Sequence, residues 1–139
     1  YEKELESISN LYVTTDDGSS QYKGLVTEML QRLVDEGKQY DEVIAIGPLI
    51  MMKFVCKLTK EYGIKTTVSM NPIMIDGTGM CGGCRLTVGG ETKFACVDGP
   101  DFDGHKVDWD LAVKRNQMYA EFEKHKHEEV CNLFRQEVK

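Results

Sequence analysis

The feature that most constrains this chain is a glycine-rich segment that carries four potential metal ligands. Asp76, Cys81, Cys84 and Cys96 follow one another with four, two and eleven intervening residues, and eight of the thirteen glycines lie within 77–104. Apart from the aspartate, this spacing matches a plant-type [2Fe-2S] site. Glycine permits positive φ values and close backbone approach, so that N–H groups can reach cluster sulfides. The segment therefore predicts a loop folded around an iron-sulfur cluster.

Two other interpretations of the same residues stay open. A Cys-x-x-Cys pair with a third cysteine nearby is also a zinc pattern, and Asp76 or His105 could complete a tetrahedral site. Cys81 and Cys84 could instead form a redox-active pair, although such pairs usually open a helix and the intervening glycines disfavour one. If the site holds a cluster, the carboxylate is a harder ligand than a thiolate and should change its reduction potential.

The remaining cysteines and two of the histidines are expected to lie outside this site. Cys56 falls on the apolar face of a predicted helix and Cys131 falls in the C-terminal tail, where a free thiol packs as a small hydrophobe. His125 and His127 stand among lysines and glutamates, which is typical of a solvated helix face.

Upstream of the cysteines, predicted strands alternate with predicted helices. The run Val43–Ile46 is apolar throughout, as expected for a central strand buried on both faces of a parallel sheet. The β-α-β-α-β order predicts an α/β fold, in which helices flank a parallel sheet. Strands are predicted at 11–15, 43–46 and 65–69, and helices at 25–34 and 50–58.

Loops that follow parallel strands meet at one edge of the sheet, where open α/β folds bind ligands. The three loops here are Asp16–Ser19, Gly47-Pro48 and Asn71-Pro72. Turns need glycine, proline and aspartate in any case, which explains these residues equally well. We predict a small-molecule site at this edge, with Asp17, Gly18 and Ser19 among its binding residues.

The rest of the chain divides by composition. A hairpin across Gly89-Gly90 is predicted from strands at 85–88 and 92–96, and the tail from Trp109 to Val138 is predicted to be helical. We therefore expect three regions: an α/β part at 1–72, a metal-binding lobe at 73–108 and a helical tail at 109–139.

Charge and hydropathy exclude some classes of function. The net charge of −6 comes with no basic stripe, so nucleic acid is not an expected partner. No apolar run approaches the roughly 20 residues that span a bilayer, and the first residues do not resemble a signal peptide. We expect a cytoplasmic protein without a membrane span, and the opening without Met suggests a piece of a longer chain.

Two segments resemble a known family: MIDGTGMCGGCR, which starts at Met74, and FACVDGPDFDG, which starts at Phe94. They are similar to the cluster segment of the small subunit of NADH-dependent ferredoxin:NADP oxidoreductase. Related proteins are described as sulfide dehydrogenase or cytosolic hydrogenase gamma subunits. The electron-transfer subunit of dihydroorotate dehydrogenase is also similar, but it has a cysteine where this chain has Asp76. The resemblance continues upstream in YVTTDDGS from Tyr12 and IGPLIMM from Ile46.

The resemblance implies a mechanism of electron transfer. Hydride would pass from NAD(P)H to FAD on an N-terminal domain outside this chain, and single electrons would then pass through a [2Fe-2S] cluster. The acceptor would be a larger iron-sulfur/flavin subunit or ferredoxin. Residues 1–72 would be the rear part of a ferredoxin-reductase-like nucleotide-binding domain, with Gly47, Pro48 and Met51 near the nicotinamide or flavin. No catalytic acid or base is expected, and the fragment alone should be inactive without the FAD domain.

Two other functions remain consistent with the sequence. The chain could be a non-catalytic module in which structural zinc fixes the glycine-rich lobe against a partner. It could also be a free-standing regulator that binds a nucleotide.

Overall fold

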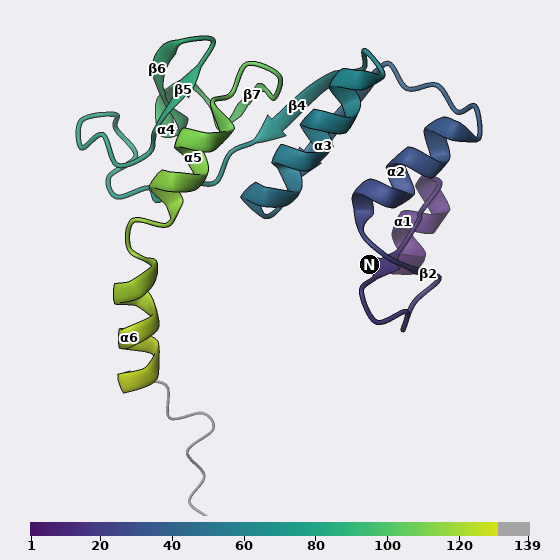
Figure 1. Cartoon of the computed structure of the whole chain (residues 1–139), viewed down its shortest axis with the longest axis horizontal. Helices are drawn as coiled ribbons and strands as arrows, with labels where there is room; N and C mark the ends of the chain where they lie inside the picture. Colours follow the sequence, from purple (N-terminus) through teal and green to yellow (C-terminus); the bar gives the residue numbers. More distant parts are fainter. Residues whose placement is uncertain (131–139) are drawn as a thin grey trace, which may run out of the picture.

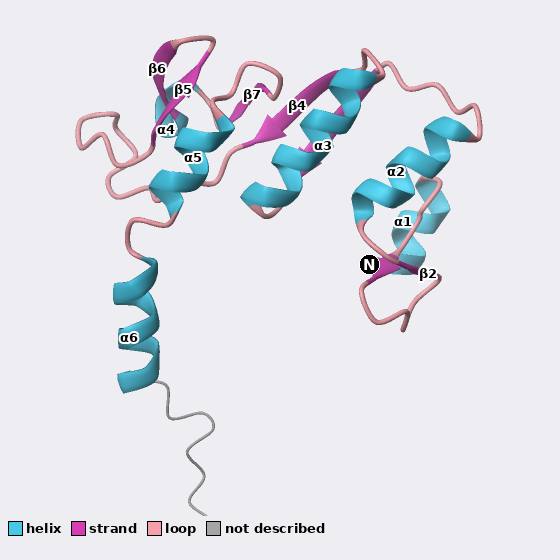
Figure 2. Ribbon diagram, in the orientation of Figure 1, coloured by secondary structure: helices cyan, strands magenta, loops and turns pink. Residues whose placement is uncertain are grey.

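A three-stranded sheet occupies the middle of the molecule in this computed structural model, which describes residues 1–130 (Figures 1 and 2). Its strand order is β3-β4-β7, with β3 parallel and β7 antiparallel to β4. Helix α3 joins β3 to β4 and packs against both, so the predicted β-α-β crossover is present. The elements are β3 (Glu42–Ile46), α3 (Leu49–Glu61), β4 (Lys65–Ser69) and β7 (Asp101–Asp103).

The main core lies between α3, the sheet and the glycine-rich lobe. Helix α3 contributes Met52, Val55 and Cys56, and the lobe contributes Cys84 and Leu86 to the same cluster of buried side chains. The lobe therefore packs as part of one continuous core rather than as a separate body. Because Cys84 belongs to this core, the position of the candidate ligands is tied to the packing of the α/β part.

Strand β3 is an edge strand, and the prediction that it is buried on both faces was wrong. Ala45 is buried, but Ile44 is 67% exposed and Ile46 is 70% exposed. These two side chains point to the face opposite α3, because side chains alternate along a strand. No element within residues 1–130 covers that face.

The N-terminal part forms a small unit of its own. It contains α1 (Glu2–Ile8), β1 (Thr14–Thr15), β2 (Tyr22–Lys23) and α2 (Val26–Asp35). β1 pairs in parallel with β2 and not with the central sheet, so the predicted first strand of that sheet was wrong. Consequently loop 16–19 does not share an edge with the loops at 47–48 and 71–72. The β-branched composition predicts a strand but does not identify its partner.

The predicted hairpin is present but shorter at its second strand. β5 (Arg85–Val88) pairs antiparallel with β6 (Glu91–Phe94) across two glycines with positive φ, Gly89 and Gly90. The strand predicted to reach Cys96 ends at Phe94, because the next residues turn into the short helix α4 (Ala95–Asp98). Cys96 therefore lies on a helical turn.

The tail is helical over the residues that the structure describes, but it is divided in two. α5 (Trp109–Asn116) begins after Asp108, whose carboxylate accepts a hydrogen bond from the backbone N–H of Leu111. α6 (Ala120–Val130) follows after a break. The predicted helical positions 131–138, including Cys131, lie outside the described residues. Within residues 1–130, no helix is long and apolar enough to cross a membrane.

Candidate iron-sulfur site

Two of the four candidate ligands lie directly together. The Sγ of Cys84, at the end of the loop before β5, is 3.1 Å from the Sγ of Cys96 on α4. Cys84 is buried and Cys96 is half-buried. Burial acts to raise the pKa of Cys84, but hydrogen bonds with Cys96 outweigh it and lower that pKa. The same sulfur–sulfur contact, together with desolvation, raises the pKa of Cys96. Cys84 is therefore the more acidic thiol of the pair.

Asp76 and Cys81 form a second pair within the preceding loop. The Asp76 carboxylate accepts hydrogen bonds from the backbone N–H of Thr78 at 2.8 Å and of Cys81 at 3.1 Å. These bonds, led by that of Thr78, lower the pKa of Asp76, so its carboxylate is ionised at neutral pH. The Cys81 thiol is exposed, and its sulfur accepts a hydrogen bond of 3.4 Å from the N–H of Gly83.

Glycines allow this loop to turn tightly and to contact α4. Gly77, Gly79 and Gly82 have φ values of 78°, 83° and 66°, which other residues rarely adopt. The backbone N–H of Gly79 donates a hydrogen bond to the Cys96 sulfur, which opposes part of the rise in the pKa of Cys96 that Cys84 and desolvation cause. A Cβ on Gly79 would lie 3.2 Å from Val97, so a larger residue would push the loop away from α4. The loop with Asp76 and Cys81 thus closes toward the turn that carries Cys96.

The four candidate ligands do not converge on one point. Among the described residues, no group of three or more His, Cys, Asp or Glu side chains is placed to hold a single metal ion. His105, considered as a zinc ligand, instead has its Nε2 atom 3.1 Å from the Thr59 hydroxyl. The donors form two pairs, one of thiols and one of a carboxylate and a thiol.

The predicted nucleotide-binding residues fall in two separate places. The Asp17 carboxylate accepts a 2.9 Å hydrogen bond from the Ser19 N–H, which lowers its pKa, in the exposed loop between β1 and β2. Gly47 and Pro48 follow β3, and the end of the Met51 side chain lies 2.5 Å from where a Cβ on Gly47 would be. The pocket that Pro48 and Met51 line does not include Asp17, Gly18 or Ser19.

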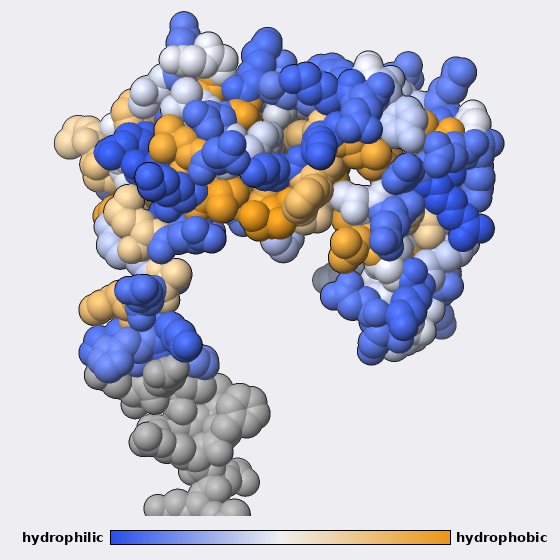
Figure 3. Space-filling model, in the orientation of Figure 1, coloured by the Kyte–Doolittle hydropathy of each residue, from blue (hydrophilic) through white to orange (hydrophobic). Residues whose placement is uncertain are grey.

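Pro48 and Met51 do line an apolar pocket with the start of α2. The pocket has a volume of about 420 Å³ and also includes Leu25 and Phe54. Figure 3 shows apolar surface on both sides of the hollow between the N-terminal unit and α3. The sequence patterns did not predict that the first turn of α2 would lie here.

Comparison with known proteins identifies the cysteine-bearing segment. Residues 71–108 match the family model described as the iron-sulfur cluster binding domain of dihydroorotate dehydrogenase B. These residues are similar in sequence to that domain. The domain begins at the end of β4 and reaches the start of α5, and it contains all four candidate ligands.

The chain as a whole is related to electron-transfer subunits. It is 64% identical over 121 residues to an uncharacterized protein in the adh 3′ region of Clostridium beijerinckii. It is 52% identical over 125 residues to the dihydroorotate dehydrogenase B (NAD(+)), electron transfer subunit homolog of Thermotoga maritima. These alignments cover 86% and 90% of the chain, but only 41% and 44% of the relatives.

The fold has a counterpart among solved structures. A chain in the structure of NADH-dependent reduced ferredoxin-NADP oxidoreductase, reported for its bearing on flavin-based electron bifurcation, matches with a TM-score of 0.79 at 51% identity. The match covers 89% of this chain and 44% of that chain. The ferredoxin-reductase-like α/β fold and the predicted family resemblance are confirmed, and the chain spans less than half the length of its relatives.

Proposed function

We propose that this chain relays electrons in a flavin- and iron-sulfur-dependent oxidoreductase, and that Asp76, Cys81, Cys84 and Cys96 hold a [2Fe-2S] cluster. The observation that carries the proposal is the sorting of these donors into two pairs. In a [2Fe-2S] centre each of the two irons takes two protein ligands. Asp76 with Cys81 would serve one iron, and Cys84 with Cys96 the other. Structural zinc would need all its ligands around a single point.

The chain's own residues would hold and shield this cluster, which when bound supplies reversible one-electron transfer. Backbone N–H groups of the glycine-rich loop are available to the sulfur atoms, as the bonds to Cys81 and Cys96 illustrate. Buried Cys84 and the core around Leu86 keep water from one side. Exposed Cys81 leaves the other side open, and this side is suited to exchange electrons with a partner.

We further propose that the α/β part, residues 1–72, contributes to NAD(P) binding, while residues 73–108 and 109–139 form the cluster lobe and the helical tail. Gly47, Pro48 and Met51 lie after β3, at the carboxyl edge where such folds bind ligands. FAD would bind an N-terminal domain outside this chain. The relatives support a further domain, because they are more than twice as long as this chain.

The same relatives support a proposal for the partner and the acceptor. We propose that a larger iron-sulfur/flavin subunit or ferredoxin, in the cytoplasm, receives the electrons, and that the chain without its FAD domain is inactive. The ferredoxin-NADP type is favoured over the dihydroorotate type because Asp76 stands where the latter has cysteine. With the native holoenzyme, NADPH-dependent ferredoxin reduction would support the first type, whereas dihydroorotate oxidation would support the second.

The decisive test is electron paramagnetic resonance of the anaerobically purified, dithionite-reduced native protein. We expect a reduced [2Fe-2S] signal that shifts in Asp76→Cys and disappears in Cys84→Ser. Cys56→Ser is the matched control and should keep the signal, since Cys56 contacts Gly104 and not the loop. Stoichiometric zinc without iron would overturn the proposal in favour of a structural metal.

A further inference from the structure

A second pocket lies between the cysteine-bearing loop and α5. Its volume is about 260 Å³. Buried Met70 and Leu86 form part of its wall, and Cys81 lines it from the loop side. The pocket therefore combines an apolar wall with direct access to the exposed candidate ligand. None of the predicted nucleotide-binding residues lines it.

Two arginines line this pocket without a counter-charge. Arg85 is the first residue of β5, and Arg115 lies in the last turn of α5. Within residues 1–130, neither guanidinium makes an ion pair or a side-chain hydrogen bond, and the pocket lining contains no Asp or Glu. The chain has a net charge of −6, so this concentration of positive charge is not a property of the whole surface. A pocket of this kind favours an anion.

Arg85 also contacts the loop that holds the candidate ligands. Its Nη1 atom lies 3.6 Å from the position that a Cβ on Gly82 would take. Gly82 directly follows Cys81, and only Gly83 stands between Gly82 and Cys84. An anion bound by Arg85 would lie close to Cys81. Its charge would therefore act on any redox centre that Cys81 helps to bind.

We propose that this pocket binds a small organic carboxylate, held by Arg85 and Arg115 with its carbon body against Met70 and Leu86. The planar guanidinium group of an arginine can form two parallel hydrogen bonds with a carboxylate, so the two arginines would bind the charged end of the ligand. Asn116 and Tyr119 also line the pocket and supply further donors. The volume lies just below the range of about 300–1,000 Å³ of typical ligand sites, so it suits a molecule of a few carbon atoms.

The proposal also predicts coupling to electron transfer, and this part rests on the proposed function. A cluster held by three thiolates and one carboxylate is anionic and gains another negative charge on reduction. A bound carboxylate nearby disfavours that gain, so it lowers the reduction potential. By linkage, reduction weakens carboxylate binding by the same factor.

The first measurement is calorimetric titration of the native protein with malonate, under anaerobic conditions and at constant ionic strength adjusted with chloride. We expect saturable binding with one site per chain. Arg115→Gln and Arg85→Gln should each weaken the affinity about tenfold or more, because each removes a charge-assisted contact. Arg32→Gln is the control: it makes the same charge change on α2, where Arg32 pairs with Glu36, and should bind malonate normally.

Each of the following results would overturn the proposal. One is the absence of saturable malonate binding, and another is binding that both pocket variants retain. The third is binding of a glutamate-rich peptide but not of malonate, which would assign the pocket to a protein partner. Inorganic phosphate is the comparison probe, and equal affinity for it would reject the preference for carboxylate.

A measurement of the midpoint potential distinguishes failure of the carboxylate proposal from failure of the proposed [2Fe-2S] cluster. In protein with the [2Fe-2S] signal, saturating malonate should lower the midpoint potential of the wild type and leave that of Arg115→Gln unchanged. If the protein holds no cluster, the proposed function fails, yet calorimetry still decides whether the pocket binds a carboxylate. A signal with no malonate effect on its potential would reject the coupling.

Discussion

The carboxylate of Asp98 accepts a hydrogen bond of 2.6 Å from the backbone N–H of Phe94. This bond closes the turn of α4, the element that brings Cys96 to Cys84. Asp98→Ala leaves the turn without this acceptor, and loss of a capping side chain destabilises a helix. We expect a melting temperature lower by a few degrees and faster loss of iron on anaerobic dialysis.

Asp101→Ala is a matched control for that experiment. Asp101 is an exposed aspartate on the nearby strand β7, and within residues 1–130 its carboxylate makes no hydrogen bond. Its replacement should leave iron retention unchanged. Equal iron loss in the two variants would contradict a specific role for Asp98.

Gly104 leaves no space for a side chain beside α3. A Cβ at this position would lie 2.4 Å from the Sγ of Cys56 and 2.9 Å from the Cγ1 of Val68. Gly104→Ala should therefore destabilise the protein by about 1–3 kcal/mol in urea unfolding, as overpacked core variants do. Adding Cys56→Ala removes the closest atom, so the double variant should lose less stability than the sum of the single variants. Strict additivity would show that the clash lies elsewhere.

The local elements of the fold were predictable where their patterns are strong. The helical spacing of apolar residues predicted α2 and α3, and the apolar run at 43–46 predicted β3. The patterns did not predict β7, because Asp101–Asp103 is only three residues long and two of them are aspartates, although Phe102 packs against the core. Nor did they predict that β1 would pair with β2, since pairing depends on contacts between distant residues.

The candidate site was likewise predictable from the sequence only where its residues form a local pattern. The spacing of Asp76, Cys81, Cys84 and Cys96 selected the ligand set, because loop ligands leave a signature along the chain. Arg85 and Arg115 share a pocket only through the packing of α5 on β5, and thirty positions separate them in the sequence. No local pattern could join them.

Thr59 connects α3 to β4 through a buried hydroxyl. It receives a 2.6 Å hydrogen bond from Thr66, donates to the Val55 carbonyl at 3.0 Å and lies 3.1 Å from His105 Nε2. Thr59→Val keeps the shape but removes these bonds. We expect a loss of about 1 kcal/mol in the free energy of unfolding, because Thr66 can still donate to the carbonyl of Ile64.

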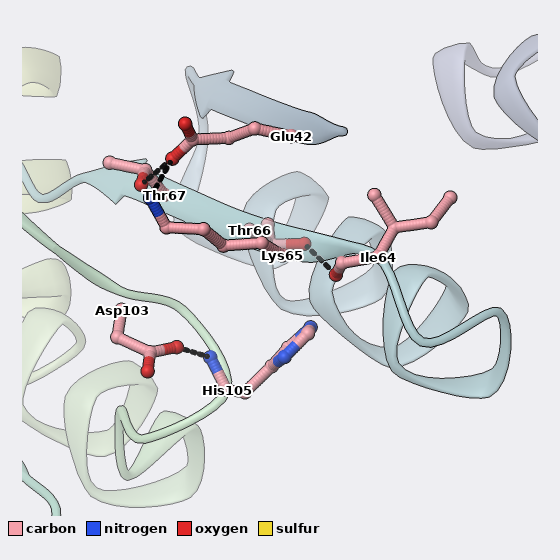
Figure 4. A network of polar contacts seen from close by, with 7 residues as sticks. All are labelled: Glu42, Ile64, Lys65, Thr66, Thr67, Asp103 and His105. Atoms are coloured by element: carbon pink, nitrogen blue, oxygen red, sulfur yellow. Dashed lines mark hydrogen bonds and ion pairs between the residues drawn. The ribbon is translucent and has the colours of Figure 1, made fainter. Parts of the chain in front are cut away.

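Thr67→Val tests whether burial determines how much unfolding free energy is lost when a threonine hydroxyl is removed. Figure 4 shows the neighbouring contact, in which Thr67 donates to the Glu42 carboxylate at 2.6 Å on the exposed side of β4. Water can replace this partner, so the loss in unfolding free energy should be smaller than for Thr59→Val. A larger loss for Thr67→Val would contradict the argument from burial.

Cys56 should make stability depend on pH in the alkaline range. Its side chain is 3% exposed, and burial together with the charge of Asp103 raises its pKa to about 11. In the unfolded chain a cysteine titrates near pH 8.5, roughly. Because the folded pKa is raised, the contribution to stability is complete below the unfolded pKa and is lost as pH rises through about 11.

The corresponding variant is Cys56→Ala, which cannot ionise. Between roughly pH 8.5 and pH 11 the free energy of unfolding of the wild type should fall more steeply than that of the variant, as measured by urea titration at fixed ionic strength. All other titrating groups are common to both proteins, so the difference in slope reports Cys56 alone. Parallel curves would mean that the folded protein ionises this thiol as readily as the unfolded chain does, and that its burial is not maintained in solution.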